Sequence, residues 1–121
     1  MTATGRRAGG LTYTAQVPES SPPDCLFCRI VAGDIPADEV VRTESVVGFR
    51  DISPQAPTHV LFVPRAHSPH AAALAQDDPA TMSELVRVAT DFAAQDGLAN
   101  GYRLVFNTGA DAGQTVFHVH L

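Results

Sequence analysis

The stretch GQTVFHVHL, residues 113–121, decides how the rest of the chain is interpreted. Two histidines in it alternate with three apolar residues, in the order Phe117, His118, Val119, His120 and Leu121. A strand with this pattern places both imidazoles on one face, with Cβ atoms ~7 Å apart, and the apolar side chains on the other. The Gly-Gln-Thr segment before the strand supplies backbone N–H groups, an amide and a hydroxyl, which suit a phosphate ester. The stretch therefore predicts a strand with one packing face and one chemically active face.

Composition limits the protein to a few classes. A chain of 121 residues supports one domain with a single modest core. The formal net charge is −5 and no basic run occurs, so we expect no nucleic-acid partner. No stretch approaches the ~20 apolar residues of a membrane span, and residues 1–24 lack a signal-peptide pattern. We therefore expect no membrane association and a cytoplasmic location.

The order of apolar patterns and chain breakers predicts the fold. Residues 1–23 show no periodicity and are expected to be a disordered extension, followed by one domain over residues 24–121. The predicted elements are a short helix at 25–32, strands at 39–43, 45–50 and 59–63, a long helix from Pro79 to Gly97, and strands at 101–107 and 117–121. The segment 65–78 is expected to be irregular or weakly helical, and the strand at 59–63 to be central. Hairpin-like pairings without a βαβ repeat predict an α+β fold with a mainly antiparallel sheet of about five strands.

The cysteines form a C-x-x-C motif at Cys25 and Cys28. A chain without a secretion signal is not expected to form a structural disulfide, so a metal site, a redox pair or buried thiols remain. The redox interpretation is disfavoured because the motif does not follow a strand in a βαβ pattern. A Cys₂His₂ set would suit a closed, tetrahedral metal site. Sequence order alone does not distinguish His67 from His70 as a third ligand.

Read together, GQTVFHVHL, the segment DISPQAPTH at 51–59 and the segment CLFC at 25–28 resemble the histidine triad (HIT) superfamily. The resemblance extends over residues 25–121 and is greatest to the nucleotide-binding, phosphoramidase-like bacterial branch. It implies the same α+β architecture and a homodimer in which two sheets join. The family motif is His-x-His-x-His followed by two apolar residues, and the third histidine is absent here. We therefore expect weak or no turnover from this chain and full competence once the strand is completed.

The resemblance assigns catalytic roles to several residues. His120 aligns with the nucleophile that attacks the α-phosphorus and forms a covalent nucleotidyl-histidine. His118 lies on the same strand, and His59 is expected to support the triad by hydrogen bonding. The residues expected near the phosphate and the leaving group are Asn107, Gly113, Gln114 and Thr115. Positioning and charge stabilisation would do most of the work in such a transfer.

The resemblance also implies a nucleoside site and a metal site. Asp51 and Ile52 are expected to hold the nucleoside, since a carboxylate can accept both ribose hydroxyls and the aliphatic side chain can lie against the base or sugar. From the residues alone, Asp51 could equally cap a turn. The implied ligands of a structural zinc ion are Cys25, Cys28, His67 and His118.

The leading functional hypothesis is a hydrolase that cleaves phosphoramidates or similar derivatives of purine nucleoside monophosphates at the α-phosphorus. Three alternatives remain open at this stage. They are a nucleotide-binding module without turnover, a dinucleoside polyphosphate hydrolase, and a zinc-stabilised scaffold for protein contacts.

Overall fold

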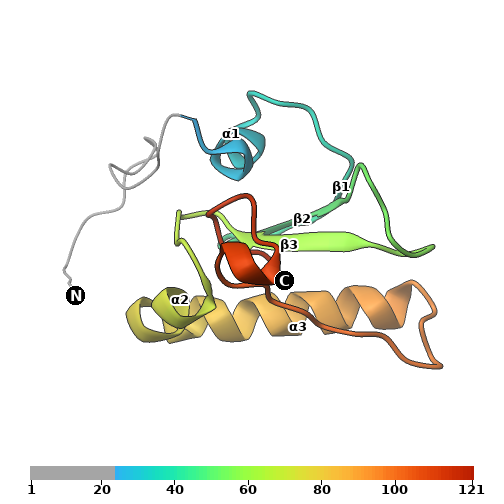
Figure 1. The fold of residues 1–121 in the computed structure, drawn as a ribbon. Coiled ribbons are helices and arrows are strands. Elements are labelled where there is room, and N and C mark those ends of the chain that lie inside the picture. The colour runs from blue at the N-terminus through green and yellow to red at the C-terminus, as the bar shows by residue number, and fades with distance from the viewer. Residues whose placement is uncertain (1–23) are drawn as a thin grey trace.

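The computed structural model describes residues 24–121, so the predicted extension at residues 1–23 lies outside the described residues. The elements in chain order are α1 (Leu26–Ala32), β1 (Glu39–Arg42), β2 (Val46–Arg50), β3 (Val60–Pro64), α2 (Ala71–Asp77), α3 (Pro79–Gln95) and a 3₁₀ turn, η1 (Ala110–Ala112). Figure 1 shows α1 on one side of the sheet and α2 with α3 on the other. The α+β class is therefore confirmed.

The sheet is antiparallel, with the order β1-β2-β3. Val47 of β2 lies opposite Val63 of β3, and both pack in a cluster with the side chains of α1. Val46 and Phe62 point to the other face and pack against α2 and α3. Gly48 is required here because a Cβ at this position would lie 2.7 Å from Cε1 of Phe62. The period-2 alternation of the strands thus divides the core into two clusters, one on each face.

The helices begin and end close to the expected residues. α1 is capped by the Cys25 side chain and ends at Gly33, whose φ of 86° is the left-handed conformation that glycine adopts easily. α3 begins with Pro79 after Asp78, whose carboxylate accepts a hydrogen bond from the Thr81 amide.

Helix α2 is a correction, because residues 65–78 were expected to be irregular or weakly helical. The His70 side chain accepts a hydrogen bond from the Ala73 amide and caps α2. Leu74 is buried beneath α2 in the core cluster that it shares with α3. Histidine is an uncommon helix cap, and α2 is a short helix with a single apolar face. A helix this short is not stable by itself in water, so α2 depends on its packing against the core.

The prediction of about five strands is wrong for the described residues, since residues 101–107 and 117–121 are not strands. A strand requires a paired neighbour. In the last segment, Leu121 exchanges two backbone hydrogen bonds with Phe62, of 2.9 and 3.0 Å, and the Val119 amide donates to the Ser68 carbonyl at 2.7 Å. The last segment therefore follows the free edge of β3 but pairs with it only at its last residue. β3 is consequently the edge strand of the three-stranded sheet rather than its centre.

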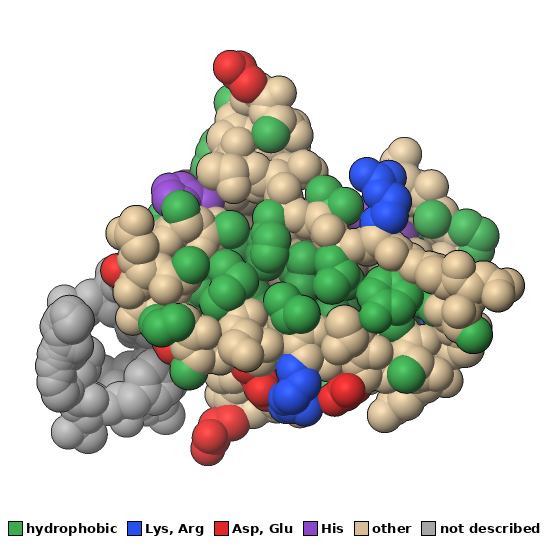
Figure 2. Space-filling model, turned by 90° about the horizontal axis from the view of Figure 1, so that it is seen from below, with side chains coloured by type: hydrophobic (Ala, Val, Ile, Leu, Met, Phe, Trp, Pro, Cys, Tyr) green, Lys and Arg blue, Asp and Glu red, His purple; other side chains and the backbone are tan. Residues whose placement is uncertain are grey.

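Residues 102–107 carry unpaired backbone groups and exposed apolar side chains. Within the described part of the chain, their backbone forms no hydrogen bond. The exposed large apolar residues of this segment, between 42 and 47% exposed, are Tyr102, Leu104 and Val105, and Phe117 in the last segment is 53% exposed. Figure 2 shows a band of apolar side chains across the face seen from below.

Over residues 24–121, no helix has both the length and the apolar character needed to cross a bilayer.

Candidate metal centre and candidate active site

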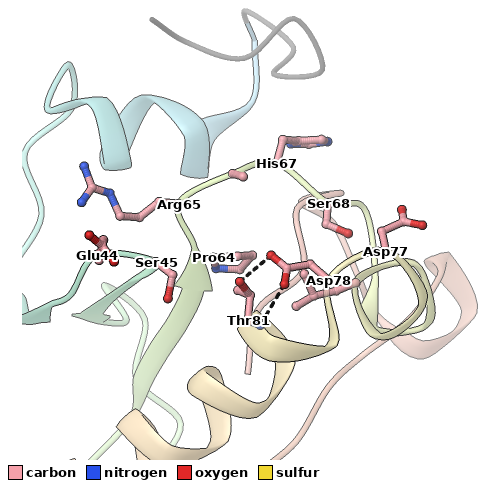
Figure 3. A pocket seen from close by; sticks show the side chains of 11 residues that line it. Glu44, Ser45, Pro64, Arg65, His67, Ser68, Asp77, Asp78 and Thr81 are labelled. Atoms are coloured by element: carbon pink, nitrogen blue, oxygen red, sulfur yellow. Dashed lines mark hydrogen bonds between the residues drawn. The ribbon is translucent and has the colours of Figure 1, made fainter. Parts of the chain in front are cut away.

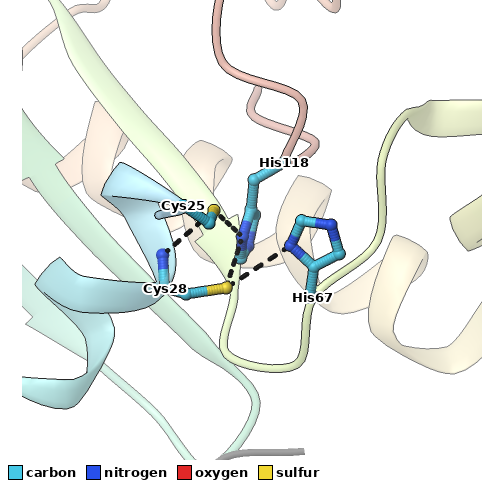
Figure 4. Close-up of side chains that lie close together, drawn as sticks. All are labelled: Cys25, Cys28, His67 and His118. Atoms are coloured by element: carbon cyan, nitrogen blue, oxygen red, sulfur yellow. Dashed lines mark hydrogen bonds between the residues drawn. The ribbon is translucent and has the colours of Figure 1, made fainter. Parts of the chain in front are cut away.

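Two cysteines and two histidines converge between α1 and the last segment (Figure 4). Nδ1 of His118 lies 3.5 Å from Sγ of Cys25 and 3.4 Å from Sγ of Cys28. Nδ1 of His67 lies 3.4 Å from Sγ of Cys28. The four potential ligand atoms all lie within 4.8 Å of one another. This set could therefore hold a metal ion, and it contains His67 rather than His70, the choice that sequence order left open.

His118 is completely buried and both of its ring nitrogens are engaged. Its Nε2 lies 2.8 Å from the Pro64 carbonyl oxygen. Because a carbonyl only accepts, Nε2 carries the proton and the lone pair of Nδ1 points at the two sulfurs. Metal-binding histidines commonly make this second contact, which fixes the tautomer and the ring orientation. His118 was expected to act in both the metal site and catalysis, and this geometry favours the metal site.

Burial is the main cause that lowers the pKa of His118 to about 4, from an ordinary value of 6.5. Burial lowers the pKa of His67 as well. In the metal-free protein, the unfolded chain therefore binds protons below pH 6.5 that the folded chain does not bind until about pH 4. Above pH 6.5, His118 is neutral in both the folded and the unfolded chain, and the free energy of unfolding has its full value. As the pH drops from 6.5 to 4, we expect this histidine to lower the free energy of unfolding by about 3 kcal/mol.

This pH dependence can be measured by urea unfolding of the chelator-treated protein at pH 7, 5.5 and 4. His118→Asn is a useful comparison because the amide does not titrate, so its stability should vary less over the same range. A free energy of unfolding that is equal at pH 7 and pH 4 in the unsubstituted protein would contradict the assignment.

Within residues 24–121, one ring nitrogen of His120 forms a hydrogen bond and the other forms none. Its Nδ1 lies 3.0 Å from the His118 carbonyl oxygen, so in the neutral ring Nδ1 carries the proton. Nε2 forms no hydrogen bond within residues 24–121, and the side chain is half-buried. An imidazole in this tautomer presents an unprotonated nitrogen, the form required of a nucleophile.

His59 contacts the loop of residues 51–59 instead of the other histidines. Its Nδ1 accepts a hydrogen bond from the Gln55 amide at 3.0 Å, so the proton lies on Nε2, which is 3.4 Å from Oδ2 of Asp51. The other carboxylate oxygen of Asp51 accepts from the Ser53 amide at 2.8 Å. The expected hydrogen bond from His59 to the histidines of the last segment is not among the contacts of the described residues. His59 and the loop together hold the Asp51 carboxylate in one orientation, next to Ile52, which is 97% exposed.

The loop before the last segment is held by Gln114, which is buried. Its Oε1 accepts from the Gly109 amide at 2.8 Å, and its Nε2 donates to the carbonyls of Pro69 and Val116 at 2.8 and 3.0 Å. Gly113 has a φ of 92°, which favours glycine. The expected phosphate-site residues Asn107 and Thr115 are exposed. Gln114 therefore shapes the loop, and the exposed side chains remain available to a ligand.

A cavity of about 850 Å³ lies beside the Cys₂His₂ cluster, between the β3–α2 connection and the start of α3 (Figure 3). Its polar lining includes Glu44 and Arg65 on one side and Asp77 and Asp78 on the other. His67 is the only predicted site residue that lines it. The cavity is therefore distinct from the surface around His120 and Asp51.

The sequence did not reveal the backbone carbonyl groups that contribute to the site. The carbonyl oxygens of Pro64 and His118 set the tautomers of the two histidines. Every residue type has a carbonyl, so no sequence pattern could have identified these two.

Comparison with known proteins places the chain in a family. The profile of the HIT domain matches residues 32–121. The purine nucleoside phosphoramidase of Escherichia coli (strain K12) is 38% identical over 99 residues, which is 81% of this chain and 83% of that protein. An uncharacterized HIT-like protein of Synechocystis sp. is 41% identical over 98 residues, 81% of this chain and 86% of that protein. The chain therefore belongs to the HIT family.

Solved structures agree with this assignment. A HIT family hydrolase from Legionella pneumophila Philadelphia 1 superposes with a TM-score of 0.77 at 42% identity, covering 80% of this chain and 88% of that one. A HIT family hydrolase from Clostridium thermocellum has a TM-score of 0.79 at 34% identity, covering 83% and 88%. The protein is thus an enzyme of the HIT hydrolase type, as the sequence motifs predicted.

Proposed function

We propose that the protein hydrolyses purine nucleoside phosphoramidates at the α-phosphorus through a covalent nucleotidyl-histidine at His120. The observation that carries this proposal is the single hydrogen bond of 3.0 Å between Nδ1 of His120 and the His118 carbonyl. It leaves the Nε2 lone pair unprotonated and unpaired in a half-buried ring. The name of the relative from Escherichia coli supports phosphoramidates as the substrate class.

The reaction would proceed in two displacements at phosphorus. Nε2 of His120 attacks, the P–N bond breaks, and the leaving nitrogen takes one proton from the solvent and departs as ammonia or an amine. The ring then bears Nδ1–H and the Nε2–P bond, so it is positively charged, and the His118 carbonyl oxygen stabilises that charge through the Nδ1–H bond. Water next attacks the phosphorus and loses one proton to the solvent, the Nε2–P bond breaks, and the nucleoside monophosphate leaves with His120 restored in its neutral form.

The nucleoside would be held by Asp51 and Ile52. The carboxylate of Asp51 is already oriented by Ser53 and His59, so it can accept the two ribose hydroxyls without reorganising. The exposed side chain of Ile52 offers an apolar surface to the base or sugar. At the phosphate, we assign Asn107, Thr115 and the backbone of Gly113, with Gln114 shaping the loop that presents them.

We further propose that the metal in the Cys₂His₂ cluster is zinc, in a structural role. Zinc bonds of ~2.3 Å to sulfur and ~2.05 Å to nitrogen at tetrahedral angles place the ligand atoms ~3.5 Å apart. Three of the four S···N distances in the cluster are 3.4 to 3.5 Å, and all four ligand atoms lie within 4.8 Å of one another. All four positions of such a site would be filled by protein atoms, so the ion would stabilise the fold and would not bind the substrate.

A homodimer is also proposed, with residues 102–107 at the contact. Unpaired N–H and C=O groups on an extended segment favour pairing with another chain. The exposed Tyr102, Leu104 and Val105 would become buried in such a contact. Light scattering that returns the mass of one chain at micromolar concentration would contradict the proposed dimer.

The test of the function is hydrolysis of adenosine 5′-phosphoramidate. The 121-residue chain is assayed beside a version whose last segment is extended by His and two apolar residues. Release of ammonia and AMP by either form supports the proposal, and activity in the extended form alone would assign an essential role to the third histidine. AMP binding without hydrolysis in both forms would reject the enzyme in favour of a binding module. A preference for dinucleoside polyphosphates would reject the substrate class.

A further inference from the structure

The cavity beside the Cys₂His₂ cluster has an acidic lining that the proposed reaction does not use. The carboxylates of Glu44, Asp77 and Asp78 line it together with the Arg65 guanidinium (Figure 3). The guanidinium donates a hydrogen bond to the Thr43 carbonyl at 3.2 Å. Within residues 24–121, the carboxylates of Glu44 and Asp77 form no hydrogen bond or ion pair. The cavity therefore carries more negative than positive charge, and two of its carboxylates have no protein partner among the described residues.

A buried hydroxyl also lines this cavity. Ser68 is 8% exposed. Its backbone carbonyl accepts a hydrogen bond from the Val119 amide, but within the described part of the chain its hydroxyl forms none. Buried polar side chains usually have a hydrogen-bond partner, so an exception needs an explanation. Hydroxyl and carboxylate oxygens suit a hydrated divalent cation. Ser68 therefore indicates a polar occupant of the cavity.

His67 belongs both to the cavity and to the Cys₂His₂ cluster. Its side chain lines the cavity, and its Nδ1 lies 3.4 Å from Sγ of Cys28. Cys25 and His118 are buried, whereas His67 and Cys28 are partly exposed. An ion that arrives from solvent therefore meets His67 or Cys28 first. Of these two residues, only His67 lines the cavity.

We propose that this cavity is the route by which the metal ion enters the cluster, and that Glu44 and Asp77 attract the ion to it. The inference rests on the proposed metal site. Cavities lined by charges of one sign concentrate ions of the opposite sign and raise their association rate. The hydrated ion exchanges water for the oxygens of the carboxylates and of Ser68, and reaches the cluster at His67. Each cysteine thiol that then binds the ion loses its proton to the solvent.

The carboxylates on this route should change the rates of metal binding and leave the affinity unchanged. The two positive charges of the bound ion are balanced by the thiolates of Cys25 and Cys28. A carboxylate outside the cluster therefore attracts the free ion strongly and the bound, neutralised ion hardly at all. Removing such a carboxylate raises the barrier on the route in both directions. Association and dissociation should consequently slow by the same factor.

The test measures metal binding, independently of any activity. The chelator-treated full chain is mixed with Co²⁺ in a stopped-flow instrument, because Co²⁺ bound to thiolates absorbs light and Zn²⁺ does not. Dissociation is measured by transfer of Co²⁺ to excess chelator. In about 10 mM salt, Asp77→Asn should slow both steps about fivefold, and Glu44→Gln should act in the same direction. In about 1 M salt, where the Debye length is about 3 Å, most of this difference should disappear.

Asp91→Asn is the matched control. Asp91 is an exposed carboxylate on α3 that pairs with Arg87 at 3.0 Å and does not line the cavity. Its replacement removes the same charge from the protein and should leave the association rate almost unchanged. Ser68→Ala removes an uncharged oxygen from the cavity wall, so it should slow association in both salt concentrations.

Three results would overturn the proposal. Unchanged rates in both Asp77→Asn and Glu44→Gln at low salt would mean that the ion enters elsewhere, such as past Cys28. Equal slowing in Asp91→Asn and Asp77→Asn would assign the effect to the net charge of the protein. A weaker affinity of Asp77→Asn with an unchanged association rate would place this carboxylate at the bound ion. If no form of the protein binds Co²⁺, the proposed metal site itself fails, whereas hydrolysis at His120 is tested separately.

Discussion

Replacing His120 with alanine is expected to abolish the nucleotidyl-protein adduct and to lower hydrolysis of adenosine 5′-phosphoramidate by at least about 1,000-fold. The alanine side chain cannot attack phosphorus, and the remaining histidines are engaged elsewhere. His118 uses both ring nitrogens, one within the Cys₂His₂ cluster and one at the Pro64 carbonyl, and His59 contacts Gln55 and Asp51. Intact-protein mass spectrometry after rapid quenching measures the adduct directly, in whichever form of the last segment is active.

Two properties of the His120→Ala variant show whether its fold survives. Its metal content and its affinity for AMP should match those of the unsubstituted protein, because His120 is neither one of the cluster residues nor part of the Asp51 loop. An adduct that persists in this variant would move the nucleophile to another residue. A variant that loses both metal and AMP binding would show instead that His120 is needed for folding.

Removing His67 is expected to have the largest effect on stability. We expect His67→Ala to weaken zinc binding by at least about 100-fold and to lower the melting temperature by about 10 °C or more. The imidazole lies 3.4 Å from Sγ of Cys28 and supplies one of four potential ligands in a partly buried cluster. Losing it leaves two thiolates and His118 without a closed coordination shell. Zinc competition with a chromophoric chelator and thermal unfolding measure the two effects.

His70→Ala is the matched control, three residues away on the same connection. His70 contacts the Ala73 amide and caps α2, and it is not one of the cluster residues. Its loss should cost about 1 kcal/mol, as for other helix caps, with metal content unchanged. Equal losses of zinc affinity in the two variants would contradict the proposed ligand set. If chelation also left the melting temperature of the unsubstituted protein unchanged, the cluster would have no structural role.

Local signals were sufficient for much of the fold. Asp78 and Pro79 marked the start of α3, and Gly33 marked the end of α1, because caps and left-handed positions depend on residue type within a few positions. The valine-rich segment at 45–50 and the continuous apolar run at 59–63 correctly predicted the strands β2 and β3. The expectation of an irregular or weakly helical segment at 65–78 missed the regular helix α2, and the count of five strands was wrong, for the same reason. Both depend on what packs or pairs with the segment, which its own sequence does not specify.

For the candidate site too, some features could be predicted from the sequence and others could not. The sequence supplied the identities of the candidate ligands and of the proposed nucleophile, because sulfur, imidazole and carboxylate chemistry belongs to the residue type. It could not supply the division of labour between His118 and His120, which have the same side chain two residues apart.

For this protein, the sequence by itself determined the α+β class, the HIT resemblance, the Cys₂His₂ set and the residues able to attack phosphorus. The family resemblance implied His67, and the tertiary structure brings it rather than His70 to the cysteines. Tertiary structure alone decided that His59 braces Asp51. It also decided that the carbonyls of Pro64 and His118 set opposite tautomers in two neighbouring histidines. The physical reason is that tautomer and orientation depend on which backbone oxygen or side chain lies within hydrogen-bonding distance. Residues distant in the chain provide most of those contacts.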